Sequence, residues 1–300
     1  MPRPLRVATR GSELARWQAT RISTLLGDDT ELVIVTTAGD VRTDVPIHAI
    51  GGTGIFVKEV QQAVLDRRAD VAVHSAKDLP ASDSPDGIVL AAVPERADPR
   101  DALVGSTLDA LPAGARVGTG SVRRRAQLAA RRPDLTFAEL RGNIPTRLDR
   151  AGEFDAIVVA AAALARLGRD HEVAEYLEPS VMLPQVGQGA LAVECRTEDT
   201  ETLARLAAID NPRAHAAVGA ERAFLAQLGG GCDLPCGALA EVVDGEIAIE
   251  ALLASNDGHV VLRATARAAS PVEAGTRVAE TLFARGGRSL LDDEPGGGRA

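Results

Sequence analysis

Residues 115–132 read ARVGTGSVRRRAQLAARR, and this stretch sets the pattern of the fold. Its first six residues (115–120) predict a short strand and a glycine turn. The remainder (121–132) predicts a helix with Ser121 at its N-cap. The same rhythm of strand, polar or glycine-rich turn and helix recurs on both sides of this stretch. A succession of such units is typical of a mostly parallel sheet covered by helices, so the stretch predicts an α/β fold.

Two α/β series and a different third part follow one another along the chain. In the first series we expect strands at 5–10, 31–37, 70–74 and 87–93, with helices at 13–26 and from the GGTG loop (51–54) to Leu65. After a charged connection, PERADPRDAL (94–103), the second series adds strands at 135–140, 154–160 and 190–195, and helices from Asn143, at 161–167 and at 198–209. Beyond Asn211-Pro212 we expect helices at 214–228 and 271–285 and strands near 238–243, 246–255 and 259–268. The predicted fold class is α/β, with two doubly wound lobes that enclose a cleft, plus a small α+β C-terminal domain.

Composition limits the classes of function. The chain has 300 residues, enough for two or three domains, and 45% of them are hydrophobic, so we expect a folded protein. A net charge of −9 disfavours nucleic acid or an acidic membrane as a partner. The N-terminus, MPRPLRVATR, lacks the apolar run of a signal peptide, and the apolar run at 156–165 is too short for a membrane span. We therefore expect a cytoplasmic protein.

Arginines recur where the expected strands give way to helices. Six of them stand at such junctions: Arg10, Arg123, Arg124, Arg141, Arg147 and Arg166. An arginine in the first turn of a helix opposes the helix dipole, and an anionic ligand would offset that cost. Together the six predict a cleft that holds carboxylates or phosphates, the alternative being that they only solubilise their helices. The GGTG loop lacks the GK[ST] of a P-loop and no GxGxxG follows a strand, so a nucleotide is not favoured.

The segment VHSAKDLP (73–80) places Lys77 and Asp78 in a polar loop after an apolar strand. In open α/β sheets, ligands bind beyond the carboxyl ends of the strands. This position favours a binding or catalytic role for the pair. The alternative is an exposed loop with a surface ion pair, which would contribute little to stability.

Two of the three cysteines lie in GGGCDLPCG (229–237). The spacing of Cys232 and Cys236 does not match a zinc site, and a disulfide between them would be strained around Pro235. Cys195 falls in a hydrophobic strand and is interpreted as a small core residue. Cys232 is therefore expected to be a nucleophile, because the adjoining glycines leave room for a bulky adduct.

The sequence resembles the porphobilinogen deaminase (hydroxymethylbilane synthase) family from about residue 5 to about residue 285. The segments that carry the resemblance occur in the family's order: RVATRGSELARWQA, GGTGIFVKE, DVAVHSAKDLP, ERADPRDAL, GTGSVRRRAQL, LRGNIPTRL, DAIVVAAAALARLG, LPQVGQGALAVECR and GGGCDLPCG. The resemblance implies two lobes with the fold of periplasmic binding proteins and a third, α+β domain with the cysteine loop. The implied domains are 1–93 with 190–210, then 97–185, then 213–300 with a disordered tail.

The resemblance also implies an activity. Four porphobilinogen molecules would be condensed head to tail into linear hydroxymethylbilane, with release of four ammonia molecules, on a dipyrromethane cofactor held by a thioether. The family's attachment cysteine matches Cys232, and its catalytic aspartate matches Asp78, with Lys77 beside it. Loss of ammonia from an aminomethylpyrrole leaves a positively charged azafulvenium, which a fixed carboxylate can stabilise. The acetate and propionate groups on every pyrrole give the arginines a ligand.

The family match assigns further residues to the cofactor and the substrate. Those expected to hold the dipyrromethane are Arg10, Ser12, Lys77, Thr119, Ser121, Arg123, Arg124, Arg141, Arg147 and Arg166. Those expected to contact porphobilinogen are Arg10, Phe56, Arg141, Arg147 and Arg166. No metal, nucleic acid or membrane is expected to bind, and the family suggests a monomer.

The sequence departs from the family pattern at Ala38 and Thr53, where some relatives carry basic residues, and at Gly120, where a second hydroxyl residue is common. Cys236 is an extra thiol that we expect to be a bystander, the alternative being a rival attachment point. Two other functions stay open. One is a non-catalytic two-lobed anion-binding protein, which would need neither Asp78 nor Cys232. The other is a thiol-dependent enzyme with His215 as its base.

Overall fold

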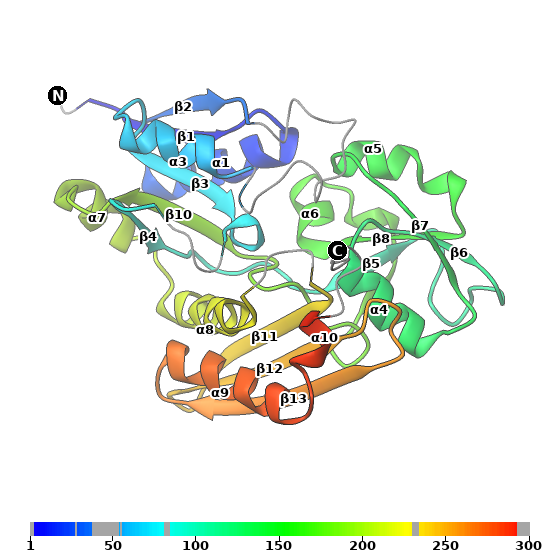
Figure 1. Cartoon of the computed structure of the whole chain (residues 1–300). Coiled ribbons are helices and arrows are strands. Elements are labelled where there is room, and N and C mark those ends of the chain that lie inside the picture. The colour runs from blue at the N-terminus through cyan, green and yellow to red at the C-terminus, as the bar shows by residue number, and fades with distance from the viewer. Residues whose placement is uncertain are drawn as a thin grey trace, which may run out of the picture.

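The computed structural model describes residues 3–27, 29–37, 54, 56–80, 85–229 and 234–292. Within these residues the strands form three sheets. Figure 1 shows two lobes above a third unit, which we call lobe 1 (blue and cyan, with residues 191–207 in yellow-green), lobe 2 (green) and the C-terminal unit (yellow to red). None of the helices that the structure describes combines the length and the apolar character needed to cross a membrane.

Lobe 1 is built on a five-stranded sheet with the order β2-β1-β3-β10-β4. Its elements are β1 (Leu5–Arg10), α1 (Glu13–Leu26), β2 (Thr30–Val35), α3 (Lys58–Leu65), β3 (Val71–Ser75), β4 (Ile88–Ala92), β10 (Leu191–Arg196) and α7 (Thr200–Ala207). β1 pairs in parallel with β2 and β3, whereas β10 runs antiparallel between β3 and β4. Val73 packs with Ile22 of α1, and Ala72 packs with Val64 of α3 on the opposite face. Helices therefore bury both faces of the sheet.

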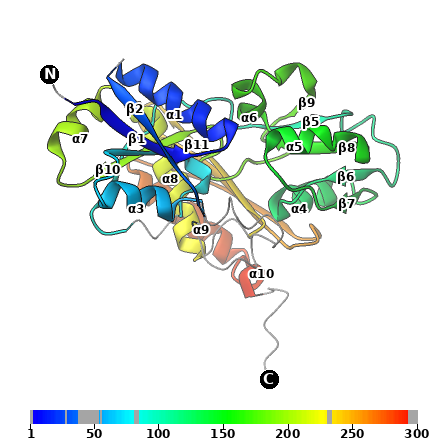
Figure 2. The ribbon, with the colours of Figure 1, turned by 90° about the horizontal axis from the view of Figure 1, so that it is seen from above.

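Lobe 2 repeats this plan with the order β7-β6-β8-β5-β9. Its elements are β5 (Asp101–Val104), β6 (Arg116–Gly118), α4 (Val122–Arg131), β7 (Thr136–Ala138), α5 (Ile144–Asp149), β8 (Ala156–Ala160), α6 (Ala161–Arg166) and β9 (Val173–Leu177). β5 runs antiparallel between β8 and β9, the place that β10 has in lobe 1. Seen from above, the two lobes lie side by side (Figure 2). The predicted class, two α/β lobes with helices on both faces of their sheets, is confirmed.

Two features of lobe 2 differ from the sequence expectation. The prediction that 94–103 is only a connection is wrong at its end, because Asp101–Val104 form the fully buried β5. The charge of Asp101 made this end of the stretch look exposed, but two arginines of α4 compensate it inside the protein. β9 was also not expected. It is an edge strand in which only Leu177 is buried, so its apolar signal is weak.

The C-terminal unit is an antiparallel sheet, β11-β12-β13, with two long helices on one face. Its elements are α8 (Pro212–Leu228), β11 (Cys236–Val243), β12 (Glu246–Ala254), β13 (Val261–Ala268), α9 (Pro271–Ala284) and α10 (Ser289–Asp292). α8 and α9 approach so closely that a Cβ on Gly275 would lie 2.4 Å from the Ala220 carbonyl oxygen. Leu252 of β12 packs with Ala126 of α4, which joins this unit to lobe 2. The expected α+β unit is confirmed, although α10 was not predicted.

Two segments cross between the lobes, the outgoing crossing (93–100) and the return crossing (178–190). They touch where the Ala97 N–H donates to the Gly189 carbonyl oxygen, at 3.1 Å. Gly189 has φ +86°, and a Cβ there would lie 2.4 Å from the Ala97 carbonyl oxygen. Only glycine can adopt this backbone conformation so close to another segment of the chain.

A buried ion pair joins both crossings to the C-terminal unit. Arg96 of the outgoing crossing pairs with Glu221 of α8, with Nη1 and Oε1 2.6 Å apart and Glu221 fully buried. Glu221 also accepts hydrogen bonds from the N–H groups of Gly187, at 2.7 Å, and Ala240, at 2.9 Å. One carboxylate therefore contacts the outgoing crossing, the return crossing and β11.

Candidate active site

The loop after β3 carries Lys77 and Asp78. It makes a single turn of 3-10 helix, Ala76–Asp78, so both side chains lie beyond the carboxyl end of the strand. The Ala76 N–H donates to the Ala190 carbonyl oxygen at 3.0 Å. A Cβ on Gly187 would lie 2.8 Å from the Ala76 carbonyl carbon. The return crossing thus supports this loop directly.

A small pocket of about 20 Å³ lies beside Asp78 and is also lined by Arg10, Phe56 and Ser75. The Arg10 guanidinium lies over the Phe56 ring, 4.0 Å from its centroid. This cation–π contact holds Arg10 at the pocket. The pocket has room for about one water molecule, so a pyrrole ring enters only if the lining side chains move. Asp78 is thereby brought together with two of the residues expected to bind substrate.

Cationic side chains from both lobes converge beside the loop. Burial lowers the pKa of Lys77 to about 8. The charges of Arg124 and Arg147 also lower this pKa, whereas two nearby carboxylates raise it. Burial likewise lowers the pKa of Arg147 to about 10, with contributions from Arg124 and Arg141. Cations that depress one another's pKa are held together without enough negative charge. The cluster therefore fits an anionic ligand, whose carboxylates would favour the protonated forms.

Arg123 and Arg124, in the first turn of α4, are buried against Asp101 of β5. The Asp101 Oδ1 accepts from Arg124 Nε at 3.0 Å and Nη2 at 2.7 Å, and its Oδ2 lies 2.8 Å from Arg123 Nη2. The Arg123 contact is close enough for an ion pair but is not aligned as a hydrogen bond. Burial alone would raise the pKa of Asp101, but the two arginines lower it to about 2. With two cations to one carboxylate, the cluster keeps a net positive charge.

Asp101 is a member of the arginine cluster that the sequence reasoning missed. The arginines in the first turn of α4 predicted an anionic ligand, but the Asp101 carboxylate supplies part of the negative charge that they need. Gln188 of the return crossing completes the arrangement by donating to Asp101 Oδ1 at 3.0 Å and to the Pro99 carbonyl oxygen at 2.8 Å. The return crossing is therefore bonded to the same carboxylate as α4.

Three hydroxyl residues expected at the cofactor act as hydrogen-bond acceptors for the backbone. Ser12 caps α1 by accepting from Ala15 N–H at 3.3 Å, and Ser121 caps α4 by accepting from Arg124 N–H at 3.4 Å. Thr119 accepts from Ser121 N–H at 3.2 Å. A hydroxyl that accepts in this way still has an O–H to donate to an anion.

A side chain on Gly120, between Thr119 and Ser121, would require its neighbours to shift by a few tenths of an ångström. A Cβ there would lie 3.0 Å from Glu139 Oε1 and 3.2 Å from the Leu140 carbonyl oxygen. A larger residue would push into the start of the loop that carries Arg141.

The three predicted arginines whose contacts are not yet described belong to lobe 2. Arg141 pairs with Glu139, with Nε and Oε1 2.7 Å apart, and Arg147 donates to the Gly142 carbonyl oxygen at 2.8 Å. Arg166 donates to the Gly189 carbonyl oxygen at 2.6 Å, and burial lowers its pKa to about 10. An arginine has five N–H groups, so none of these bonds uses up its capacity to bind a carboxylate.

The three cysteines differ in environment. Cys195 is fully buried in β10, and burial raises the pKa of its thiol to about 11, so its interpretation as a core residue is confirmed. Cys236 is buried at the start of β11, near enough to Arg123 to act on that residue's pKa. Cys232, the expected attachment point, lies outside the described residues, as do Ala38, Thr53 and the tail beyond 292.

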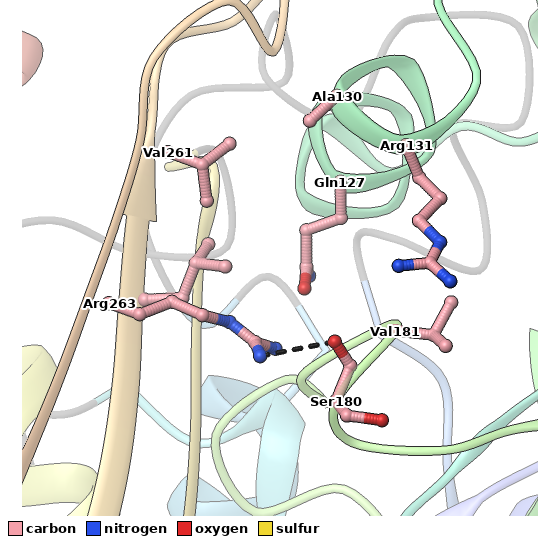
Figure 3. Close-up of a pocket in the computed structure, with 8 residues that line it drawn as sticks. Gln127, Ala130, Arg131, Ser180, Val181, Val261 and Arg263 are labelled. Atoms are coloured by element: carbon pink, nitrogen blue, oxygen red, sulfur yellow. Dashed lines mark hydrogen bonds between the residues drawn. The ribbon is translucent and has the colours of Figure 1, made fainter.

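A larger hollow of about 180 Å³ lies between α4, residues 180–181 and strands β12 and β13 (Figure 3). Arg263 projects across it and donates to the Ser180 carbonyl oxygen at 3.1 Å. None of the predicted site residues lines this hollow. No group of three or more potential metal ligands occurs among the residues that the structure describes.

Comparison with known proteins covers nearly the whole chain. Residues 5–204 match the family model described as porphobilinogen deaminase, dipyromethane cofactor binding domain, and residues 215–284 match that of the porphobilinogen deaminase C-terminal domain. The porphobilinogen deaminases of Roseiflexus sp. (strain RS-1) and Roseiflexus castenholzii are each 48% identical to it over 302 residues, covering 97% of this chain and 99% of theirs. Among solved structures, a TRAP periplasmic solute binding protein from Desulfovibrio salexigens aligns with 70% of this chain and 72% of its own, at 10% identity and a TM-score of 0.42.

Proposed function

This chain belongs to the porphobilinogen deaminase family, and from that premise we propose a role for each residue gathered between its lobes. The family's reaction is a transferase reaction of porphyrin biosynthesis. It condenses four porphobilinogen molecules into linear hydroxymethylbilane, with release of ammonia, on a dipyrromethane cofactor. The chain's own side chains supply the charges and hydrogen bonds that this reaction needs.

The observation that carries the proposal is the convergence of Lys77, Arg124 and Arg147 beside Asp78. These cations come from two lobes, and the pKa values of Lys77 and Arg147 are lowered by burial and by neighbouring cations. A ligand that carries several carboxylates compensates them all at once. Pyrroles with acetate and propionate groups are such ligands, whereas a neutral substrate would leave the cluster uncompensated.

We assign the dipyrromethane to this cluster, attached through Cys232. When bound, the cofactor supplies the pyrrole carbon to which the first substrate is joined. Lys77 and the lobe 2 arginines hold its acid groups, and the hydroxyls of Ser12, Thr119 and Ser121 donate further hydrogen bonds. Asp101 holds the guanidinium groups of Arg123 and Arg124 in place, because one carboxylate pairs with both.

Asp78 is assigned the chemical role. Departure of ammonia from porphobilinogen requires a proton on the leaving amine and leaves positive charge on the ring. That proton leaves with the ammonia, and the Asp78 carboxylate, fixed at the end of its 3-10 turn, stabilises the positive charge that remains on the ring. Arg10 and Phe56, which share the pocket with Asp78, are assigned to the substrate ring and its acid groups.

We further propose that the protein works as a cytoplasmic monomer with domains 1–93 plus 190–210, 97–185 and 213–300. Support for these limits comes from the sheets, since β10 completes lobe 1 and β5 to β9 complete lobe 2. Sedimentation at several protein concentrations tests the monomer, because self-association would make the measured mass rise with concentration.

Intact-mass spectrometry tests the attachment. We expect the active protein to be heavier than its sequence by one dipyrromethane, and the modified peptide to contain Cys232. The Cys232→Ser variant should have the unmodified mass and form no hydroxymethylbilane, whereas Cys236→Ser should keep both the adduct and the activity. An adduct on the Cys236 peptide, or an unmodified mass in active protein, contradicts the assignment. Anion binding without any product would favour the non-catalytic alternative.

A second test uses the pKa of Lys77. We expect kcat/KM for porphobilinogen to fall at alkaline pH, above the pKa of about 8 that Lys77 has without the cofactor carboxylates, because loss of the Lys77 proton removes its attraction for carboxylates. Lys77→Arg keeps its charge at higher pH, so its alkaline limb should move up by more than about one pH unit. pH–rate profiles of both proteins at constant ionic strength decide the matter. The same alkaline limb in both would assign the titration to another group.

A further inference from the structure

Trp17 of α1 lies against Arg166, the last residue of α6, at the seam between the lobes. The guanidinium carbon is 5.7 Å from the centroid of the ring. Figures 1 and 2 both show α1 and α6 next to each other where lobe 1 meets lobe 2, and the two helices are in contact. Trp17 is the single tryptophan of the chain.

The packing of lobe 1 does not account for a tryptophan at this position. The buried face of α1 consists of Ala15, Gln18, Ala19 and Ile22, and Trp17 lies off that face with 39% of its surface exposed. A ring of this size loses much favourable burial when it is left at a surface. The partner that the structure gives it is the arginine of the other lobe.

Arg166 is held from two sides. Its Nη2 donates to the Gly189 carbonyl oxygen of the return crossing, at 2.6 Å, and the Trp17 ring lies against its guanidinium. A π face stabilises a partly desolvated cation without introducing a negative charge that would compete for its N–H groups. The hydrogen bond to Gly189 uses one of the five N–H groups of Arg166, so others remain for a carboxylate.

We propose that Trp17 is a positioning residue for Arg166, holding its guanidinium at the seam for a substrate carboxylate while the lobes are together and releasing it when they separate. This inference rests on the proposed function, in which Arg166 binds substrate carboxylates. Lobe 1 thereby controls a binding residue of lobe 2, and the cleft loses a fixed cation whenever the lobes part. Trp17 acts through Arg166 and has no other role in the reaction.

Steady-state kinetics of Trp17→Leu test this role, since leucine stays apolar but has no π face. We expect KM for porphobilinogen to rise about 3–10-fold with kcat changed by less than about twofold, and Trp17→Phe to fall between. In an Arg166→Ala background, Trp17→Leu should raise KM no further, because its target is gone. Acrylamide quenching of the single tryptophan should increase in Arg166→Ala, where the guanidinium no longer covers the ring.

Leu25→Ala is the matched control, because Leu25 lies on the same helix and is 38% exposed. It should keep the wild-type KM. An unchanged KM in Trp17→Leu, or an equal rise with and without Arg166, overturns the inference. A wild-type protein that forms no hydroxymethylbilane contradicts the proposed function instead, so the two failures are distinguishable.

Discussion

Replacement of Asp78 by asparagine is expected to lower kcat by about 10²–10⁴-fold in a protein that still folds and binds anions. Asp78 is half-buried at the end of its 3-10 turn, in the pocket that it shares with Arg10 and Ser75. Asparagine keeps the shape of the side chain and one hydrogen-bonding oxygen. It carries no negative charge, so it cannot neutralise the positive charge that develops on the ring. The loss therefore falls on kcat, because binding of the acid groups depends on other residues.

Rates of hydroxymethylbilane formation and thermal unfolding should be measured on the same preparations. Asp86→Asn is the matched control, since Asp86 is exposed in the turn before β4 and does not line the pocket beside Asp78. It makes the same change of charge and should keep the wild-type kcat. If kcat of Asp78→Asn stays within about tenfold of wild type, another group stabilises the charge.

The second large effect concerns stability. Asp101→Asn is expected to lower the free energy of unfolding by about 3–5 kcal/mol. Asp101 is fully buried and is the counter-charge of Arg123 and Arg124, with contacts of 2.8 and 2.7 Å. Asparagine leaves both guanidinium groups buried without a negative charge, and the cost of desolvating them is no longer offset. Urea unfolding at pH 7 measures the loss.

The pH dependence gives an independent reading of the same ion pair. Burial raises the pKa of Asp101, but the charges of Arg123 and Arg124 lower it from 3.8 to about 2. The folded state therefore holds the carboxylate ionised more firmly than the unfolded state. Its stabilising contribution is complete above about pH 4 and is lost as the pH falls towards 2. The difference in stability between wild type and Asp101→Asn should shrink over that interval.

Asp134→Asn provides the control for Asp101→Asn. Asp134 pairs with Arg132 at 2.7 Å at the surface, so its loss should have a far smaller effect on the free energy of unfolding. A cost for Asp101→Asn as small as that of the control would mean that the two arginines are compensated by other groups. If the difference in stability between wild type and Asp101→Asn does not depend on pH, protonation of Asp101 does not contribute to acid unfolding.

The lobes and the C-terminal unit could be predicted because their signals are local. Ser121 stands at the N-cap where the sequence placed it and accepts from the backbone N–H three residues later. The loop with Lys77 and Asp78 could be found by the same reasoning, since it follows an apolar strand. Periodicity and capping act within one or two turns of chain, so they are readable without the structure.

The features that could not be predicted depend on residues far apart in sequence. β5 begins at Asp101, and a strand with an acid at its start reads as a connection until Arg124, 23 residues later, is placed against it. The contact between Trp17 and Arg166 is likewise visible only when the two lobes are assembled. Charge compensation inside a fold is a long-range property, and a single sequence does not reveal which charges meet.

The place of β10 in lobe 1 has a consequence for synthesis on the ribosome. Among the strands that the structure describes, β4 has β10 as its sole neighbour in the sheet, yet the five strands of lobe 2 lie between them in sequence. At about 5–20 residues per second, translation leaves β4 without that neighbour for about 5–20 s. The lobe that is begun first is therefore completed second. A nascent chain that stops between residues 178 and 190 has every strand of lobe 2 but only four of the five strands of lobe 1.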